Sequence, residues 1–382
     1  MWKYLIPFYN PDSENWAIPA RVLRWLTLVW LLMGLVVLFS ASYAVAEAKY
    51  GNGLFYFQRQ VIWAYLGLLL FNWVTRHSLT YFFKLTPYAF FIFLALIFAT
   101  QGFEPINGAQ RWIDLRVVSL QPSELIKPFL VLQGAIVFAG WERFSNLGRG
   151  FWLGSFAAVL GGIFIQPNLS NTALCGMSLW LLALTGMIRW RYLLMVAASG
   201  VMLATLSITF RDYQRKRVTS FLNPWGDPQG DGYQLVQSLL AIGSGEIWGK
   251  SFGLSQQKLF YLPFQYTDFI FAVFAEEFGF AGCVLLLIVI TSFMTMGLVV
   301  AQQAQDPVRR LVAVGAVVFL VGQSLINIGV ATGSLPTTGL PFPLFSYGGS
   351  SMLASLLLAG LLVRVAIETR QNNVVEFPQR SR

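Results

Sequence analysis

Long hydrophobic stretches alternate with short polar connections along almost the whole chain. Ten stretches have about the 20 residues that an α-helix needs to cross a bilayer. They lie near 25–45, 58–75, 82–100, 123–140, 151–167, 171–188, 192–210, 268–300, 311–332 and 350–368. The pattern predicts an all-α polytopic membrane protein with ten transmembrane helices. The first stretch is too long for the core of a cleavable signal peptide, so we expect the chain to retain it.

Lys and Arg are distributed unevenly between the two sides of such a bundle. An even number of spans places both termini on one side, and that side carries 15 Lys and Arg against 4 in the short connections of the other. Because basic residues in short loops favour the cytoplasm, both termini are predicted to be cytoplasmic. The segments 101–122, 211–267 and 333–349 then face outward, and 211–267 forms a large extracytoplasmic loop between helices 7 and 8.

The predicted organisation has three parts. A cytoplasmic N-terminal arm covers 1–20, a single ten-helix membrane domain covers 21–370, and a polar cytoplasmic tail covers 371–382. Neither an internal repeat nor a linker to a second domain is evident in the pattern. A loop as long as 211–267, with patterned glycine, aromatic and polar residues, is typical of a functional segment.

Composition agrees with the membrane prediction and excludes other classes. Charged residues make up 11% of the chain, against about 25% in soluble domains. The net charge is +9, but the basic residues are scattered through short loops, so membrane lipids and not nucleic acid are the expected partners. With one His, and with two Cys that fall in apolar runs, the sequence predicts neither a disulfide framework nor a structural zinc site, and no metal ligands are assigned.

Asp268 is the leading candidate for chemistry, because it stands where an apolar run begins. A carboxylate in that position is costly unless it has a function, but a helix N-cap explains it equally well. Glu276 and Glu277 follow at the same end of the run. They point about 100° apart on a helix, so at most one shares a cavity with Asp268, and the other is expected to bind a loop.

A second cluster combines Arg111 and Trp112 with Glu124 and Lys127. Glu124 and Lys127 are three residues apart and can pair on one helix face. The spacing leaves two interpretations open. The pair is either a local ion pair that lets both charges enter the membrane, or part of a polar cavity with Arg111 and Trp112 at its rim.

Two further segments could bind an anion. Arg215, Lys216 and Arg217 follow the seventh apolar stretch on the predicted outer side, against the usual charge bias, which suggests phosphate headgroups or a phosphorylated ligand. At the tenth stretch, Gly348, Gly349 and Ser350 allow close backbone approach or an anion site made of amides.

Taken together, these segments resemble the SEDS family (shape, elongation, division, sporulation), membrane glycosyltransferases that polymerise peptidoglycan from lipid II. The matching motifs are Gly-Ala-Gln-Arg-Trp-Ile at 108–113, Gln-Pro-Ser-Glu-Leu-Ile-Lys at 121–127, Thr-Asp-Phe-Ile-Phe-Ala at 267–272, Glu-Glu-Phe-Gly at 276–279 and Ser-Tyr-Gly-Gly-Ser-Ser at 346–351. Segments 217–249 and 368–370 resemble the branch of the family that acts in cell division more than the elongation branch. One departure is Asn168, where the family has an aspartate.

The resemblance implies a ten-span fold and an outward-facing cavity in which Asp268 is the essential acid, with Glu124, Lys127 and Arg111 close by. It also implies a class B penicillin-binding protein as crosslinking partner, other membrane proteins of the division machinery, and a place in the bacterial plasma membrane at the division septum. No cofactor is required by the sequence, although a divalent cation could assist.

The chemistry expected of such an enzyme suits these residues. Lipid II carries its sugar on a diphosphate in α linkage, so one inverting displacement needs a single base, here Asp268. Arg111 and Lys127 would stabilise the diphosphate, followed by Arg215, Lys216 and Arg217. Two rivals stay open: a transporter that flips lipid-linked precursors, and a scaffold of the division machinery without turnover.

Overall fold

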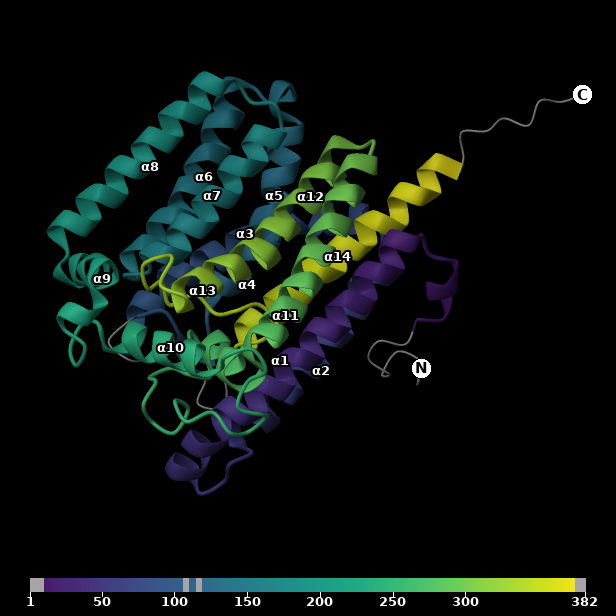
Figure 1. Ribbon diagram of the computed structural model, residues 1–382. Coiled ribbons are helices and arrows are strands. Elements are labelled where there is room, and N and C mark those ends of the chain that lie inside the picture. The colour runs from purple at the N-terminus through teal and green to yellow at the C-terminus, as the bar shows by residue number, and fades with distance from the viewer. Residues whose placement is uncertain (1–9, 106–109, 115–118, 375–382) are drawn as a thin grey trace, which may run out of the picture.

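The computed structural model describes residues 10–105, 110–114 and 119–374, and within this part the chain is a bundle of long helices (Figure 1). The N-terminal helices are α1 (Ile18–Tyr50), α2 (Phe55–Arg76), α3 (Leu79–Ala99), α4 (Pro122–Leu125), α5 (Lys127–Ala139), α6 (Asn146–Ile165), α7 (Leu169–Thr185) and α8 (Trp190–Phe210). The C-terminal helices are α9 (Asp212–Leu222), α10 (Tyr233–Ser244), α11 (Ile270–Gln303), α12 (Pro307–Val317), α13 (Gln323–Ala331) and α14 (Gly349–Val374).

A few short elements complete the description. Single turns of 3₁₀-helix lie at Pro11–Asn15, Thr100–Gly102, Trp141–Arg143 and Pro224–Gly226, and a π-helical turn at Val318–Gly322 joins α12 to α13. The strands β1 (Ile113–Asp114) and β2 (Ser119–Leu120) pair antiparallel. Helix α1 already begins within the segment predicted as an N-terminal arm, and residues 375–382 of the predicted tail lie outside the described residues.

The all-α polytopic prediction is confirmed, since each predicted stretch coincides with a helix or with consecutive helices. In the described residues, eight helices or helix pairs are long and apolar enough to cross a membrane. The other two predicted spans are α2, which buries Gln60 and Asn72, and α7, which has 17 residues. The buried polar residues of α2 lower its mean hydropathy, although neighbouring helices shield them. The number of membrane-spanning helices, predicted as ten, therefore stays a prediction.

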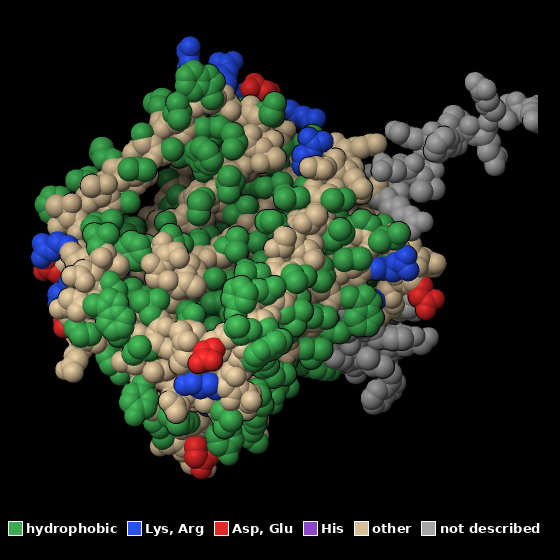
Figure 2. Space-filling view, in the orientation of Figure 1, with side chains coloured by type: hydrophobic (Ala, Val, Ile, Leu, Met, Phe, Trp, Pro, Cys, Tyr) green, Lys and Arg blue, Asp and Glu red, His purple; other side chains and the backbone are tan. Residues whose placement is uncertain are grey.

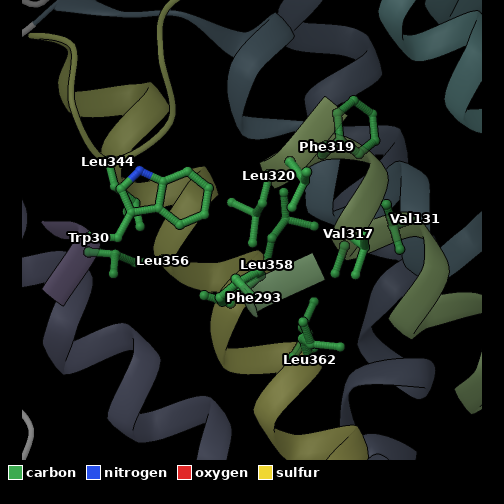
Figure 3. Close-up of a cluster of buried hydrophobic side chains, with 14 of the residues drawn as sticks. Trp30, Val131, Phe293, Val317, Phe319, Leu320, Leu344, Leu356, Leu358 and Leu362 are labelled. Carbon is green, nitrogen blue, oxygen red and sulfur yellow. The ribbon is translucent and has the colours of Figure 1, made fainter. Parts of the chain in front are cut away.

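The core of the bundle forms where α1, α11 and α14 meet the α12–α13 segment. Figure 3 shows Trp30, Phe293, Phe319 and Leu358 packed together from these elements, and all four are buried. Trp30 meets Phe293 edge to face at 5.5 Å, a favoured aromatic geometry. Helix α2 packs along α14, where Gly67 leaves room for Leu356. These contacts hold the helices that support the functional end.

The outside of the molecule is largely apolar. Figure 2 shows hydrophobic side chains over the broad middle of one face, with charged side chains mainly towards its edges. Helix α8 stands at the side of the bundle in Figure 1, and only 11% of its most apolar window is buried. Exposed apolar surface of this extent suits a protein that is covered by lipid.

Helix α11 differs from the continuous 268–300 helix predicted from the sequence. It begins at Ile270 and is interrupted at Gly279, which has φ 65° and ψ −168°. The backbone amides of Phe280 and Ala281 donate to Glu246 and Ile247 in the preceding loop, at 2.9 and 3.0 Å. Loop carbonyls therefore replace helical acceptors for these two amides, and a side chain at 279 would collide with this loop.

Candidate active site

A cavity of about 580 Å³ lies at the end of the bundle where α9, α10 and the loops before α11 and α14 meet. Its lining includes eight of the predicted site residues, from five separate segments. These are Arg111 and Trp112 before β1, Glu124 in α4, Lys216 and Arg217 in α9, Asp268 before α11, and Gly348 and Ser350 at the start of α14. The structure thus brings together motifs that are up to 239 residues apart (111 to 350).

Asp268 does not cap helix α11. The helix begins at Ile270, its N-cap position is Phe269, and no side chain accepts a capping hydrogen bond there. Within the described residues, the Asp268 carboxylate has no hydrogen bond or ion pair, whereas its backbone carbonyl accepts one from Asn327 at 2.8 Å. The backbone is held while the carboxylate is left for the cavity, so the capping interpretation is wrong.

The electrostatic environment of Asp268 contains two opposing effects. Surrounding protein desolvates the half-buried carboxylate and raises its pKa to about 6, although the nearby Arg217 and Arg111 lower it. Gly339, with φ 71°, approaches closely, since a Cβ there would lie 3.5 Å from Asp268 Oδ2 and 3.9 Å from Arg217 Nη2. A carboxylate with a pKa near 6 is ionised at neutral pH and still basic enough to accept a proton.

Arg111 is held at the opposite rim by backbone carbonyls. Its Nε donates to the Gln166 carbonyl at 2.9 Å, and its Nη2 donates to the Pro167 carbonyl at 2.5 Å. Gln166 is itself fixed, because its side chain donates to Thr100 Oγ1 at 2.7 Å. Carbonyls do not neutralise the guanidinium, so Arg111 remains a positive charge at the cavity. Residues 106–109, which include the first part of its motif, lie outside the described residues.

The three basic residues of α9 have different surroundings. Arg217 donates to the Thr337 carbonyl at 3.0 Å and to the Tyr213 hydroxyl, and it lines the cavity. Lys216 also lines the cavity, where it pairs with Asp231 at 3.4 Å. Arg215 points elsewhere, and its exposed guanidinium pairs with Asp212 at 2.7 Å. Helical spacing therefore separates Arg215 from the two neighbours that face the site.

Glu124 and Lys127 form the ion pair that their spacing predicts, with Lys127 Nζ 2.6 Å from Glu124 Oε1. Only Glu124 is among the residues that line the cavity. Lys127 is buried behind it and donates a second hydrogen bond to Gln323 Oε1 at 3.0 Å. Both interpretations of the pair thus hold in part, while contact between Lys127 and a diphosphate stays a prediction.

In the glycine-serine segment at the start of α14, too, only some of the predicted residues line the cavity. Gly348 and Ser350 line the cavity, and Ser350 Oγ accepts a hydrogen bond from the Gln121 amide at 2.9 Å. Gly349 is not among the lining residues, and a Cβ there would lie 2.3 Å from the Trp63 ring. Its small size serves the packing of α14 against α2.

Glu276 and Glu277 do not line the cavity. Glu276 accepts hydrogen bonds from the backbone or side chains of five residues, which are Ser244, Lys250, Ser255, Gln256 and Gln257. Glu277 Oε1 lies 2.7 Å from Lys258 Nζ and 2.5 Å from Ser40 Oγ. The expectation that one glutamate binds a loop therefore extends to both.

Several lining residues were not assigned from the sequence. Tyr213 supports Arg217, Gln121 reaches Ser350, and Tyr347 and Asn168 complete the wall. The sequence did mark Asn168 as unusual, because the SEDS family has an aspartate at this position. That difference alone did not show that Asn168 lines the cavity. In the described residues, no group of three His, Cys, Asp or Glu could hold a metal ion. A role for a divalent cation stays a prediction.

The fold and the cavity together define a polytopic membrane protein with a charged site at one end of its helical bundle. The family model described as "Cell cycle protein", for FtsW, RodA and SpoVE, matches residues 20–371. The chain belongs to this family. The predicted SEDS resemblance is thereby confirmed.

Curated relatives support this family assignment. The chain is 55% identical over 376 residues to the probable peptidoglycan glycosyltransferase FtsW of Synechocystis, covering 98% of this chain and 95% of the relative. It is 48% identical to the putative peptidoglycan glycosyltransferase FtsW of Mesostigma viride, covering 99% and 91%. These names confirm the likeness to the division branch.

Two solved structures share the fold. One is a peptidoglycan synthase complex that coordinates polymerization and crosslinking, with a TM-score of 0.74, 28% identity, and 91% and 98% coverage. The other is the rod shape determining protein RodA of Thermus thermophilus, with a TM-score of 0.66, 28% identity, and 90% and 95% coverage.

Proposed function

We propose that this protein is a peptidoglycan glycosyltransferase that polymerises lipid II into glycan strands. Its relatives carry that activity in their names, and the chain covers nearly their whole length. The observation that carries the proposal is the isolated carboxylate of Asp268 in a cavity that also contains Arg111 and Arg217. This combination supplies a base and cations, the two things that transfer of a sugar from a diphosphate requires.

Asp268 acts as the general base. The 4-hydroxyl oxygen of the acceptor sugar attacks the anomeric carbon of the donor, and the bond between that carbon and the diphosphate oxygen breaks. Asp268 accepts the hydroxyl proton as the new bond forms. One displacement inverts the α linkage to β, so no second carboxylate is needed as a nucleophile. The pKa of about 6 matches this task near neutral pH.

Arg111 and Arg217 stabilise the diphosphate leaving group. Negative charge grows on the diphosphate as the bond breaks, and fixed cations in a partly desolvated cavity lower that barrier without reorganising. Both guanidiniums are already held by carbonyl oxygens, which orient them and leave their charge uncompensated. Lys216 contributes less, because Asp231 partly neutralises it. If a divalent cation binds, Glu124 is the lining carboxylate that would hold it, and the ion would supply further electrostatic stabilisation of the leaving group.

The cavity end of the bundle is extracytoplasmic in this proposal, and both termini are cytoplasmic. The distribution of Lys and Arg supports this orientation. The partner is a class B penicillin-binding protein, which crosslinks the strands, and the similarity to a peptidoglycan synthase complex supports such a pair. Similarity to FtsW favours the division septum and further division proteins as the setting.

The test is polymerisation of lipid II by purified protein in the presence of its cognate transpeptidase. Asp268→Asn is expected to reduce strand formation by about 10²–10⁴-fold, because that is the typical contribution of a general base. Asp212→Asn is the matched control, since it removes an exposed carboxylate whose ion pair in the described part of the chain is with Arg215. Normal polymerisation by Asp268→Asn contradicts the base assignment.

The same preparation separates the enzyme from its rivals. A flippase would move labelled lipid II across vesicles without forming strands, and a scaffold would bind its partner without either reaction. Strand formation that depends on Asp268 excludes both as the sole function.

A further inference from the structure

A buried amide on α13 connects the candidate base to a distant loop. The side-chain nitrogen of Asn327 donates to two carbonyl oxygens, that of Asp268 at 2.8 Å and that of Leu340 at 2.9 Å. Two carbonyl oxygens face one atom of the side chain, so that atom must be the amide nitrogen. Asn327 is 1% exposed. It therefore joins the segment before α11 to the segment before α14 at the position of the base.

One helical turn earlier, Gln323 makes an equivalent connection on the other side. Its Nε2 donates to the Pro341 carbonyl at 2.6 Å, and its Oε1 accepts from Lys127 Nζ at 3.0 Å. Lys127 in turn pairs with Glu124, which lines the cavity. Gln323 and Asn327 are four residues apart and lie on the same face of α13. Adjacent carbonyls of one loop, at 340 and 341, receive one hydrogen bond from each.

Apart from Ser324, the other residues of the helix that carries these amides are apolar, and the π-helical turn at Val318–Gly322 comes directly before Gln323. A π-helical turn changes the direction in which the following side chains point, and such turns are frequent at functional sites. Buried amides in an apolar helix are costly unless every group finds a partner. Here the donors meet backbone carbonyls beside the cavity, whereas Asn327 Oδ1 is buried without a partner among the described residues. The protein therefore accepts the cost of one unpaired oxygen to hold the two carbonyls in place.

We propose that Asn327 is a positioning residue that sets the place of Asp268 relative to the cavity, with Gln323 holding the opposite Glu124–Lys127 pair from the same helix. This inference rests on the proposed glycosyltransferase function. Asn327 is not among the residues that line the cavity, and it acts through the backbone of Asp268. A base must lie within hydrogen-bonding reach of the acceptor hydroxyl, and a displacement of about 1 Å can cost on the order of 10² in rate.

The experiment measures kcat and KM for lipid II polymerisation by the complex of the full chain with its transpeptidase. Asn327→Ala is expected to lower kcat per folded molecule by about 10²-fold and to change KM less than about twofold, because Arg111 and Arg217 are held by the carbonyls of Gln166, Pro167 and Thr337 and make no hydrogen bond with Asn327. Ser324→Ala is the matched control. Ser324 is equally buried on α13, but among the described residues its hydroxyl donates within the segment, to the Leu320 carbonyl one turn earlier.

Asn327→Ser tests the same contact with a smaller perturbation, since a hydroxyl retains one donor in place of the amide. We expect kcat to fall by about 10-fold, between the wild type and Asn327→Ala. This variant also serves when Asn327→Ala does not yield folded protein. Gln323→Glu keeps the oxygen that accepts from Lys127 and loses the nitrogen that donates to Pro341. We expect its kcat to fall by a similar factor of about 10.

The outcomes separate this inference from the proposed function. If the wild type and Ser324→Ala polymerise while Asn327→Ser has the wild-type kcat, Asn327 does not position the base and only the inference fails. The inference also fails if the activity of the Asn327 variants falls only in proportion to the fraction of folded protein. If the wild type itself forms no strands while Asp268→Asn behaves identically, the proposed function fails instead.

Discussion

Asp268 and the pair Glu276 and Glu277 lie at the same end of α11, yet their surroundings are opposite. The two glutamates are almost fully buried; donors of the neighbouring loop bind both oxygens of Glu276, and Ser40 of α1 and Lys258 bind Glu277 Oε1, while Glu277 Oε2 has no partner in the described residues. Asp268 has partial access to the cavity, and within the described part of the chain its carboxylate has no hydrogen-bond partner. The glutamates join segments of the fold, whereas the aspartate is desolvated without a hydrogen bond, and the nearby Arg217 and Arg111 offset its desolvation only in part.

This contrast shows how to separate structural from functional carboxylates in a membrane protein. A buried charge that is saturated with hydrogen bonds stabilises the arrangement that surrounds it, and removing it disrupts that arrangement. A desolvated charge without such bonds costs stability, and it persists when its reactivity is useful. The following predictions test the comparison from its largest expected effect on stability to its smallest.

Glu277→Ala is expected to destabilise the protein most. It leaves the Lys258 ammonium buried without its counter-ion, and such a loss costs about 3–5 kcal/mol. Thermal unfolding in detergent measures the effect. The double variant Lys258→Met with Glu277→Leu should recover most of the stability, because it removes both charges. Wild-type stability of Glu277→Ala alone would mean that the pair does not hold the loop.

Glu276→Gln is expected to cost about 1–3 kcal/mol, because an amide keeps one acceptor oxygen and turns its NH₂ towards donors of the loop. The same thermal measurement applies. Lys250→Met is a useful comparison, since it removes one donor at the partly exposed edge and leaves the others in place. A larger loss from Lys250→Met than from Glu276→Gln would contradict this order.

Asp268→Asn is expected to increase stability at pH 7.5, by on the order of 1 kcal/mol after allowance for solvent screening. The folded-state pKa of about 6 lies above the ordinary value of 3.8, so the folded protein binds this proton more tightly than the unfolded chain. The protonated Asp268 carboxyl therefore contributes stability at low pH, and this contribution is lost as the pH rises through about 6. Unfolding temperatures of both proteins between pH 5 and 8 should therefore diverge as pH rises; parallel curves would contradict the raised pKa.

Asp212→Asn is expected to have the smallest effect, about 0.2–1 kcal/mol, because its pair with Arg215 is exposed on both sides. High salt should reduce the difference from the wild type further. A cost that exceeds the cost of Glu276→Gln would show that exposure is a poor guide to the role of these carboxylates.

Much of the site was accessible from the sequence, and its gaps have physical causes. Glu124 and Lys127 were paired correctly because three residues on a helix bring side chains together regardless of context. The capping role of Asp268 was wrong, because a helix boundary that shifts by two residues changes which side chain can cap. Arg215 could not be separated from Arg217 without the phase of α9.

The sequence alone predicted the long apolar stretches and the local motifs, because these follow from the thickness of a bilayer and the periodicity of a helix. Other features depend on residues far apart in sequence. The break of α11 at Gly279 exists because the 246–247 backbone accepts its amides, and Asp268 meets Asn327 only through the packing of α13. Tertiary structure alone decided these, because a buried polar group takes whichever partner the fold brings to it.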